Sequence, residues 1–209
     1  LFNGDILATG YWAAQVADLK PADKVVVIGA GPTGLCTLMS IKLYSPGQVI
    51  VVDVDDERLA LAKEQGLCDV TINSRTQNVE EEILKLTNGR GADRVFEVAG
   101  AKGTFETAWK VARPNALVII VALYEEPQVL PLNLMYGKNL TFITGGVDAN
   151  SCEEIMEMVR SGKIDTSCLI THKAPLNDFM MGYRMFENRE DGVIKWVVTP
   201  YEEGREERK

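Results

Sequence analysis

The clearest pattern in this chain is the alternation of short apolar runs with amphipathic segments. Lys24–Ile28 is an apolar run, a helical segment follows it, and a second apolar run ends at Asp53. Further strands are predicted at 69–72, 94–98, 116–123 and 139–144, and further helices at 57–65, 78–89 and 104–111. Near-continuous apolar runs are typical of parallel strands covered on both faces. The pattern predicts an α/β protein with a doubly wound, six-stranded parallel sheet of order 3-2-1-4-5-6.

The last third of the chain has a different character. Ser151-x-x-Glu154 predicts a capping box for a helix through Val159, and a second helix follows Pro175. This second helix carries a stripe that we expect to pack in a core, formed by Phe179, Met180, Tyr183 and Phe186. A final strand is predicted at 196–199, and the charged tail 202–209 is expected to be solvated.

The turn after the first strand has the spacing Gly29-x-Gly31-x-x-Gly34. Gly29 permits a tight turn, Gly31 has no side chain to block a pyrophosphate, and Gly34 allows close packing of helix on strand. Pro32 suits the first helical turn, where no backbone N–H is needed. The helix N-terminus carries partial positive charge toward phosphates. Because the turn lies between a strand and a helix, it predicts a dinucleotide site.

Asp53 ends the second strand, 19 residues after Gly34. A carboxylate there accepts hydrogen bonds from the adenine-ribose hydroxyls and repels a 2′-phosphate, which favours NAD(H) over NADP(H). Arg58, in the next helix, has two interpretations: it contacts the ribose or adenine, or it pairs with Asp55 or Glu57 on the surface.

Other classes of protein fit the sequence less well. A methyltransferase also uses a glycine turn, but that turn normally follows an acid, and Ile28 precedes Gly29 here. No tyrosine has a lysine four positions later, as short-chain reductases require. The Gly-x-Ser-x-Gly turn of hydrolases is absent.

Composition narrows the partners and the compartment. The net charge of −8 argues against nucleic acid or an anionic membrane as a partner. No apolar run is long enough to span a bilayer, and no signal peptide pattern is present. The 4 cysteines are widely spaced without a CxxC pair, which predicts free, mostly buried thiols in a reducing, cytoplasmic environment.

An ordered series of motifs supports a family assignment. In chain order they are Asp5-Ile-Leu-Ala-Thr-Gly-Tyr11, the glycine turn, Asp53 to Gly66, Val95-Phe-Glu-Val-Ala-Gly100, Gly145-Gly146 and Leu169-Ile-Thr-His172. This series resembles the C-terminal portion of zinc-dependent medium-chain alcohol dehydrogenases, and the resemblance extends to about Pro200.

The resemblance implies a domain organisation. Residues 1–20 would lead in from the catalytic domain, 21–146 would form the Rossmann domain, 147–200 would pack back on the catalytic domain, and 201–209 would be a tail. The family's catalytic domain precedes this region, and the chain starts at Leu1 without an initiator Met. We therefore expect part of a longer enzyme, with no catalytic residue of its own and inactive when isolated.

Cofactor contacts also carry over by position. Val98 and Ala99 would line the adenosine side, Leu123, Thr144 and Thr9 would lie near the nicotinamide, and Lys195 would reach a pyrophosphate oxygen. The full expected NAD(H)-binding set is Thr9, Gly29, Gly31, Pro32, Thr33, Gly34, Asp53, Arg58, Val98, Ala99, Leu123, Thr144 and Lys195.

Asp5 takes the place where this family holds a ligand of the catalytic zinc. That ligand is a cysteine in many members and an acid in others, and a carboxylate is a competent zinc ligand. His172, the single histidine, is expected to be structural, so zinc binding would need further ligands from the missing domain. The expected reaction is hydride transfer between NAD and a small alcohol or carbonyl substrate.

Two questions stay open from the sequence. One is whether the chain is part of such an enzyme or a stand-alone, non-catalytic NAD(H)-binding module. The other is the assembly, because the sixth strand lies at a sheet edge and pairs across a twofold axis in relatives. We expect a homodimer through this strand, with a tetramer as the alternative.

Overall fold

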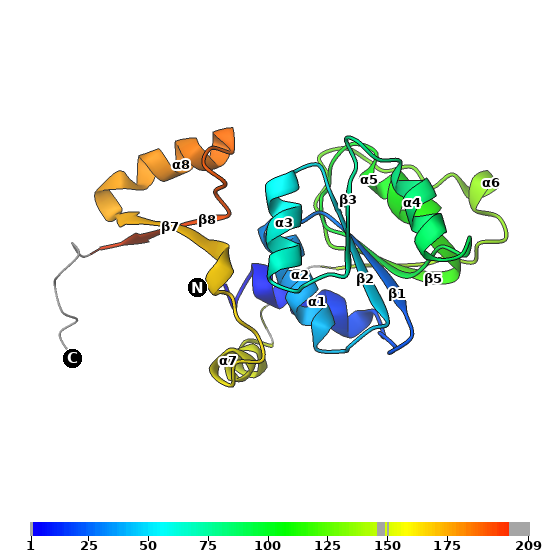
Figure 1. The fold of residues 1–209 in the computed structure, drawn as a ribbon, viewed down its shortest axis with the longest axis horizontal. Coiled ribbons are helices and arrows are strands. Elements are labelled where there is room, and N and C mark those ends of the chain that lie inside the picture. The colour runs from blue at the N-terminus through cyan, green and yellow to red at the C-terminus, as the bar shows by residue number, and fades with distance from the viewer. Residues whose placement is uncertain (1, 146–148, 150, 201–209) are drawn as a thin grey trace. The chain divides into compact units, whose positions relative to one another are not determined.

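The computed structural model of this chain describes residues 2–145, 149 and 151–200, which fall in two compact units, 1–164 and 165–209 (Figure 1). Gly146, which belongs to one of the expected motifs, and the expected tail at 202–209 lie outside the described residues. Each unit is described by itself.

The first unit is built on one parallel sheet with the strand order β3-β2-β1-β4-β5-β6, which confirms the predicted topology. The strands are β1 (Lys24–Ile28), β2 (Gln48–Asp53), β3 (Val70–Asn73), β4 (Ala92–Glu97), β5 (Ala112–Ile120) and β6 (Thr141–Thr144). The helices are α1 (Ile6–Val16), α2 (Pro32–Lys42), α3 (Asp56–Glu64), α4 (Val79–Leu86), α5 (Thr104–Val111), α6 (Leu132–Met135) and α7 (Cys152–Arg160).

Both faces of the sheet are covered, as the apolar strands predicted. Successive strand residues point to opposite faces. Val26 and Ile28 of β1 pack in a buried cluster with Ile83 of α4 and Ala108 of α5. The intervening Val25 and Val27 are equally buried, so they face the other layer. Helices α1 and α2 pack against each other, and so do α4 and α5 (Figure 1).

Helix α2 is held by two close approaches that need glycine. A Cβ at position 34 would overlap the carbonyl oxygen of Gly29. On α1, a Cβ at Gly10 would lie 2.6 Å from the backbone nitrogen of Thr37 in α2. Both contacts bring backbone against backbone, so neither can relax by rotating a side chain. They fix α2 between β1 and α1.

The predicted helix caps have different outcomes. The side-chain oxygen of Asn78 accepts a hydrogen bond from the backbone amide of Glu81 at 3.3 Å, which confirms Asn78 as the cap of α4, and its side-chain Nδ2 donates to the Glu81 carboxylate at 2.9 Å. Ser151 precedes α7, but its side chain makes no capping hydrogen bond, so that predicted box is wrong. Its ψ of 14° differs from the extended backbone that a capping residue normally adopts.

Two basic side chains donate hydrogen bonds to the carbonyls at the carboxyl ends of helices that are distant from them in the sequence. Lys138 donates from Nζ to the carbonyls of Trp109, Lys110 and Ala112 at the end of α5. Burial lowers the pKa of Lys138. Arg94 of β4 donates to the carbonyls of Ala17 at 2.6 Å and Asp18 at 2.9 Å, just after α1. Positive groups there satisfy orphan carbonyls and complement the helix dipole.

Helix α7 belongs to the first compact unit, which extends to Ile164. The thiol of Cys152 donates to the carbonyl of Asn3 at 3.4 Å. Tyr11 of α1 is buried, and its pKa is raised by that burial and by a hydrogen bond with Glu154. These contacts attach α7 to the segment that opens the chain.

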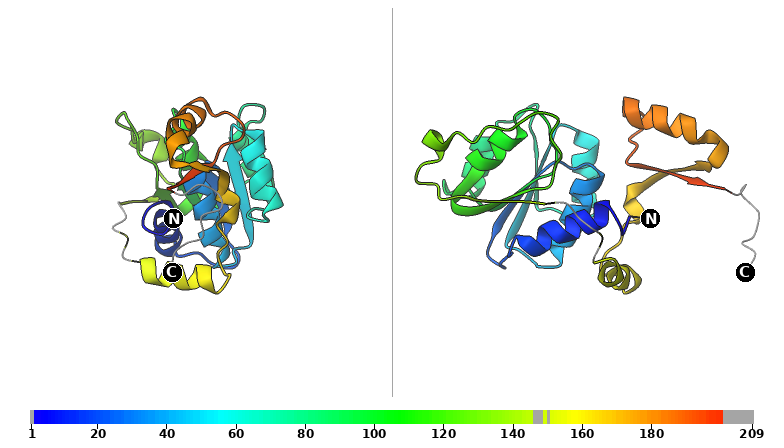
Figure 2. Two further views of the ribbon diagram at one scale, coloured as in Figure 1. Left: turned by 90° about the vertical axis from the view of Figure 1, so that its left-hand side faces the viewer. Right: turned by 180° about the vertical axis from the view of Figure 1, so that it is seen from behind.

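The second unit is small. Strands β7 (Ile170–Pro175) and β8 (Lys195–Thr199) pair in parallel, and α8 (Phe179–Asn188) runs along them (Figures 1 and 2). Two short 3₁₀ helices, η1 (Ser167–Leu169) and η2 (Leu176–Asp178), flank β7. The β7 strand was not predicted. His172 stacks on Trp196 with ring centroids 5.3 Å apart.

The expected apolar stripe of α8 does not pack in a core of the described chain. Its four residues are all exposed: Phe179, Met180, Tyr183 and Phe186. The face that α8 buries instead is at Gly182, where a Cβ would lie 2.5 Å from Cδ1 of Trp196. None of the helices described is long and apolar enough to cross a membrane.

The Gly10 contact gives a test of the fold. Gly10→Ala should destabilise the chain by about 1–3 kcal/mol, because overpacking outweighs the gain in helix propensity of about 1 kcal/mol. Urea unfolding measures this. Gly4→Ala is the matched control, because a Cβ at Gly4 meets nothing within 4 Å. Equal stability of the two variants would refute the close packing of α1 on α2.

Candidate functional site

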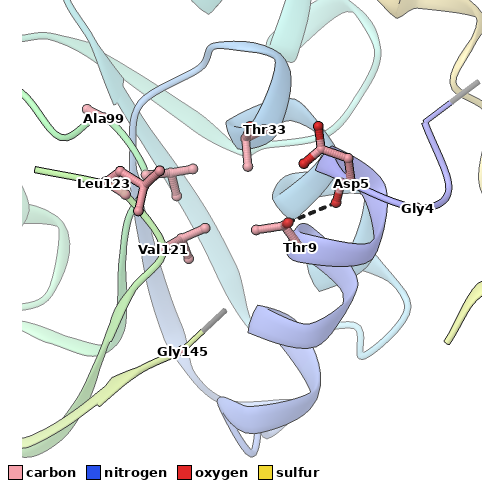
Figure 3. A pocket seen from close by; sticks show the side chains of 10 residues that line it. Gly4, Asp5, Thr9, Thr33, Ala99, Val121, Leu123 and Gly145 are labelled. Carbon is pink, nitrogen blue, oxygen red and sulfur yellow. Dashed lines mark hydrogen bonds between the residues drawn. The ribbon is translucent and has the colours of Figure 1, made fainter. Parts of the chain in front are cut away.

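A cleft of about 360 Å³ lies at the carboxyl ends of the sheet strands in the first unit. One wall comes from α1, with Asp5 and Thr9, and the other comes from the segments that follow β4 and β5, with Ala99, Val121 and Leu123 (Figure 3). The residues that line it are Gly4, Asp5, Thr9, Thr33, Val98, Ala99, Val121, Ala122, Leu123 and Gly145. Ligands of open α/β sheets bind at this edge.

The glycine turn joins β1 to α2 at this cleft. Gly29 has φ +108°, which disfavours any residue with a side chain, and its amide donates to the Val52 carbonyl at 2.7 Å. Gly31 is the N-cap of α2 and presents no side chain. The start of α2 therefore has no side-chain cap, which leaves the amides of its first turn after Pro32 available to an anion.

Asp53 braces this turn. One carboxylate oxygen accepts the amide of Ala30 at 2.6 Å, and the other accepts the amides of Val54 at 2.8 Å and Asp55 at 3.0 Å. The side chain thus connects the end of β2 to the loop after β1. Sequence reasoning assigned Asp53 to the ribose alone and missed this bracing role, because the Ala30 contact joins residues 23 positions apart.

Arg58 lies between Asp55 and the glycine turn. Its Nε lies 3.9 Å from the Asp55 carboxylate, which is a loose ion pair. Its guanidinium is also the nearest group to Gly31, since a Cβ there would lie 3.7 Å from Nη1. A cation therefore lies beside the glycine turn.

Glu97 was not predicted as a site residue, yet it supports the far wall of the cleft. It ends β4, is fully buried, and accepts the amides of Ala99 and Gly100, each at 3.0 Å, on one carboxylate oxygen. Its other oxygen accepts the hydroxyl of Tyr124. Burial and this hydrogen bond raise the pKa of Tyr124. The one signal in the sequence was an acid at the end of an apolar strand.

Two further predicted contacts come from strands β6 and β8. Thr144 lines a separate apolar hollow of about 250 Å³ with Phe105, Tyr124 and Phe142, and the next residue, Gly145, lines the cleft instead. The pairing of Thr144 with Ile120 sets this register. Lys195 begins β8 in the second unit, where its carbonyl accepts the Thr171 hydroxyl at 3.2 Å.

Asp5 occupies the N-cap position of α1 but makes no side-chain capping hydrogen bond. Its carboxylate is therefore left for the cleft that it lines (Figure 3). The hydroxyl of Thr9 donates to the Asp5 carbonyl at 2.8 Å, a bond within the helix. Across residues 2–145, 149 and 151–200, no three histidine, cysteine or acidic side chains gather as a metal site would require.

Comparison with known proteins identifies the family to which this chain belongs. Residues 32–161 match the family model of zinc-binding dehydrogenases, and the chain belongs to that family. An alcohol dehydrogenase from Cupriavidus necator is 32% identical over 203 residues, which are 94% of this chain and 55% of that protein. The chain thus spans about half the length of the curated relatives it matches.

Solved structures of similar fold include alcohol dehydrogenases. Alcohol dehydrogenase TADH from Thermus sp. ATN1 superposes with a TM-score of 0.88 at 29% identity, covering 95% of this chain and 57% of that one. An Escherichia coli alcohol dehydrogenase, solved in complex with its cofactor NADH, superposes with a TM-score of 0.85 at 26% identity. The match covers 93% of this chain and 57% of that one.

Proposed function

We propose that this chain is the NAD(H)-binding part of a zinc-dependent alcohol dehydrogenase, which transfers hydride between NAD and an alcohol or carbonyl compound. The observation that carries the proposal is the cleft at the carboxyl ends of the strands, which Thr33 of α2 lines just after the glycine turn, together with the hydrogen bond from Ala30 in that turn to Asp53. Membership of the zinc-binding dehydrogenase family supports it.

Each part of the cleft has a role in this proposal. The exposed amides at the start of α2 would hold the pyrophosphate, and Gly31 lets it approach the backbone. Thr9 and Leu123 would wall the nicotinamide on opposite sides and limit its contact with water. When bound, NAD(H) would accept or supply the hydride and zinc would polarise the substrate oxygen.

Asp53 would select the cofactor. Each carboxylate oxygen has more than one acceptor site, so Asp53 can brace the turn and still accept a ribose hydroxyl. A 2′-phosphate would instead meet Asp53 with Asp55 close by, at an unfavourable electrostatic cost. Arg58 offsets part of this negative charge, because it lies beside the turn. The balance favours NAD(H).

Nucleotide titration tests this assignment. The wild-type chain should bind NADH at least about tenfold more tightly than NADPH, a difference of about 1.4 kcal/mol. Asp53→Asn should narrow that ratio, because it removes the charge and keeps one of the two oxygens that accept backbone amides. NADH fluorescence measures both affinities. Glu57→Gln is the control, since it removes one charge from an exposed neighbour. Equal affinity of the wild type for NADH and NADPH would refute the role of Asp53.

Zinc does not fit the described residues of this chain alone. Catalytic zinc has three protein ligands and one open position, and the cleft offers the single carboxylate of Asp5. We propose that Asp5 is one ligand in the intact enzyme and that the missing domain supplies the others. No catalytic step is assigned to the chain by itself.

A metal assay checks this. The purified chain should keep far less than one zinc per molecule after desalting, and Asp5→Asn should change that little, because one carboxylate binds zinc weakly. Alcohol oxidation should be undetectable in the same sample. Tight, stoichiometric zinc in the wild type, lost in Asp5→Asn, would contradict the proposal.

A stand-alone NAD(H)-binding module remains the second candidate. The discriminating observation is the native reading frame upstream of Leu1: a segment there with cysteine and histidine ligands would exclude the module. A methyltransferase is disfavoured, because the matched family is of dehydrogenases.

We further propose a homodimer through the edge strand β6. This strand ends the sheet order, so one of its sides has no strand neighbour in the described sheet. Exposed apolar side chains lie nearby along the chain, at Val129, Leu132 and Leu134. Unpaired edges and apolar patches are unfavourable unless something covers them.

Sedimentation velocity at micromolar concentration should show a species of twice the chain mass of 23.0 kDa. Dilution should produce the monomer. A monomer at every concentration would count against the dimer, and a species of four chains would favour the tetramer.

A further inference from the structure

The wall of the cleft opposite α1 consists of two short segments, and both are tied to one residue. Val98 and Ala99 follow β4, and Val121 to Leu123 follow β5. The carbonyl of Glu97 accepts the amides of Val121 at 2.8 Å and Ala122 at 3.1 Å. Its side chain accepts the amides of Ala99 and Gly100. Glu97 therefore joins the two segments through backbone and side chain together.

Tyr124 is the remaining hydrogen-bond partner of the Glu97 carboxylate. Its hydroxyl donates to the second oxygen of Glu97, and its ring meets Phe105 edge-on with centroids 6.3 Å apart. The same junction is tightly packed at Gly100, which has φ +64° and where a Cβ would lie 2.6 Å from the carbonyl oxygen of Leu123. Leu123, which lines the cleft, thus stands between Tyr124 and Gly100.

The burial of Glu97 makes its partners important. The side chain has no exposed surface, and no cation among the described residues forms an ion pair with it. A buried carboxylate is costly unless hydrogen bonds satisfy it. Two backbone amides and one hydroxyl do so here. Tyr124 is the only side chain among these three donors, so it is the one that a substitution can remove.

We propose that Glu97 and Tyr124 form a positioning pair that holds the Leu123 wall in the shape that receives the nicotinamide half of the cofactor. The inference rests on the proposed function for the identity of the ligand. Neither residue touches the reacting atoms: Glu97 acts through the backbone of 98–100 and 121–122, and Tyr124 acts through Glu97 and the adjoining Leu123.

A merely structural role would affect the whole first unit and every ligand alike. The positioning role is local to the Leu123 wall, because Tyr124 follows β5, whereas Asp53 ends β2, which β1 separates from β4 and β5. ADP-ribose carries the adenosine and pyrophosphate of the cofactor without the nicotinamide. The ratio of NADH to ADP-ribose affinity therefore separates the two roles.

The first measurement needs no ligand. Amide hydrogen exchange should accelerate in Tyr124→Phe at 98–100 and 121–123, and stay unchanged in α2 and α4. Tyr136→Phe is the matched control, because Tyr136 is 94% exposed. Unchanged exchange at both segments would overturn the proposal whether or not the chain binds nucleotide.

The second measurement uses NADH and ADP-ribose. Tyr124→Phe should weaken NADH binding by about tenfold, near the lower end of the range for one lost hydrogen bond to a charged group, and weaken ADP-ribose binding by a clearly smaller factor, about threefold at most. Glu97→Ala should lose more NADH affinity than Tyr124→Phe does. Glu97→Gln should restore binding, because its amide oxygen can accept the two amides while its NH₂ group donates to the Tyr124 oxygen.

The outcomes are distinguishable. Equal losses of NADH and ADP-ribose affinity in Tyr124→Phe would overturn the positioning role in favour of a general structural one. Failure of the wild type to bind either nucleotide would instead refute the proposed function, and with it the cofactor as the ligand of this wall. Hydrogen exchange would then decide alone whether the pair holds the two segments.

Discussion

The backbone of α2 lies against two neighbours at distances that exclude a side chain, and the arrangement of the cleft depends on this. Gly34 meets the carbonyl of Gly29 at the turn, and Gly10 of α1 meets Thr37 further along α2. The first contact fixes the start of α2 beside the cleft, which Thr33 lines. The second brings α1 close enough for Asp5 and Thr9 to form the facing wall. One helix, fixed on two sides, thereby sets both the floor and one wall.

Acidic and basic side chains of the first unit pair with different backbone groups. Asp53 and Glu97 end two strands at the cleft edge, and each satisfies backbone amides of the following loops. Arg94 and Lys138 do the opposite, because they donate to the carbonyls at the ends of α1 and α5. Acidic side chains thus hold the loops at the carboxyl edge of the sheet, and basic side chains pair with the carbonyls at helix ends. Side chains here substitute for the backbone pairing that loops lack.

The sequence predicted the sheet order and the turn between β1 and α2, because these follow from local periodicity and fixed spacing. It could not predict the contacts that cross between strands, such as Asp53 with Ala30 or Glu97 with Tyr124. Thr144 shows a finer limit: side chains alternate along a strand, so a shift of one residue decides which hollow is lined. The exposed stripe of α8 had the periodicity of a core helix, and periodicity alone does not tell which partner covers it.

The segment between β5 and β6 is anchored near both ends, by Tyr124 on Glu97 and by Lys138 on the end of α5. Between these anchors lie exposed residues such as Val129 and Leu132. A stretch fastened in this way can accept insertions, deletions or new surface residues without transmitting the change to the cleft. A graft between the two anchors is therefore the natural route to redesigning this surface while the cleft stays as it is.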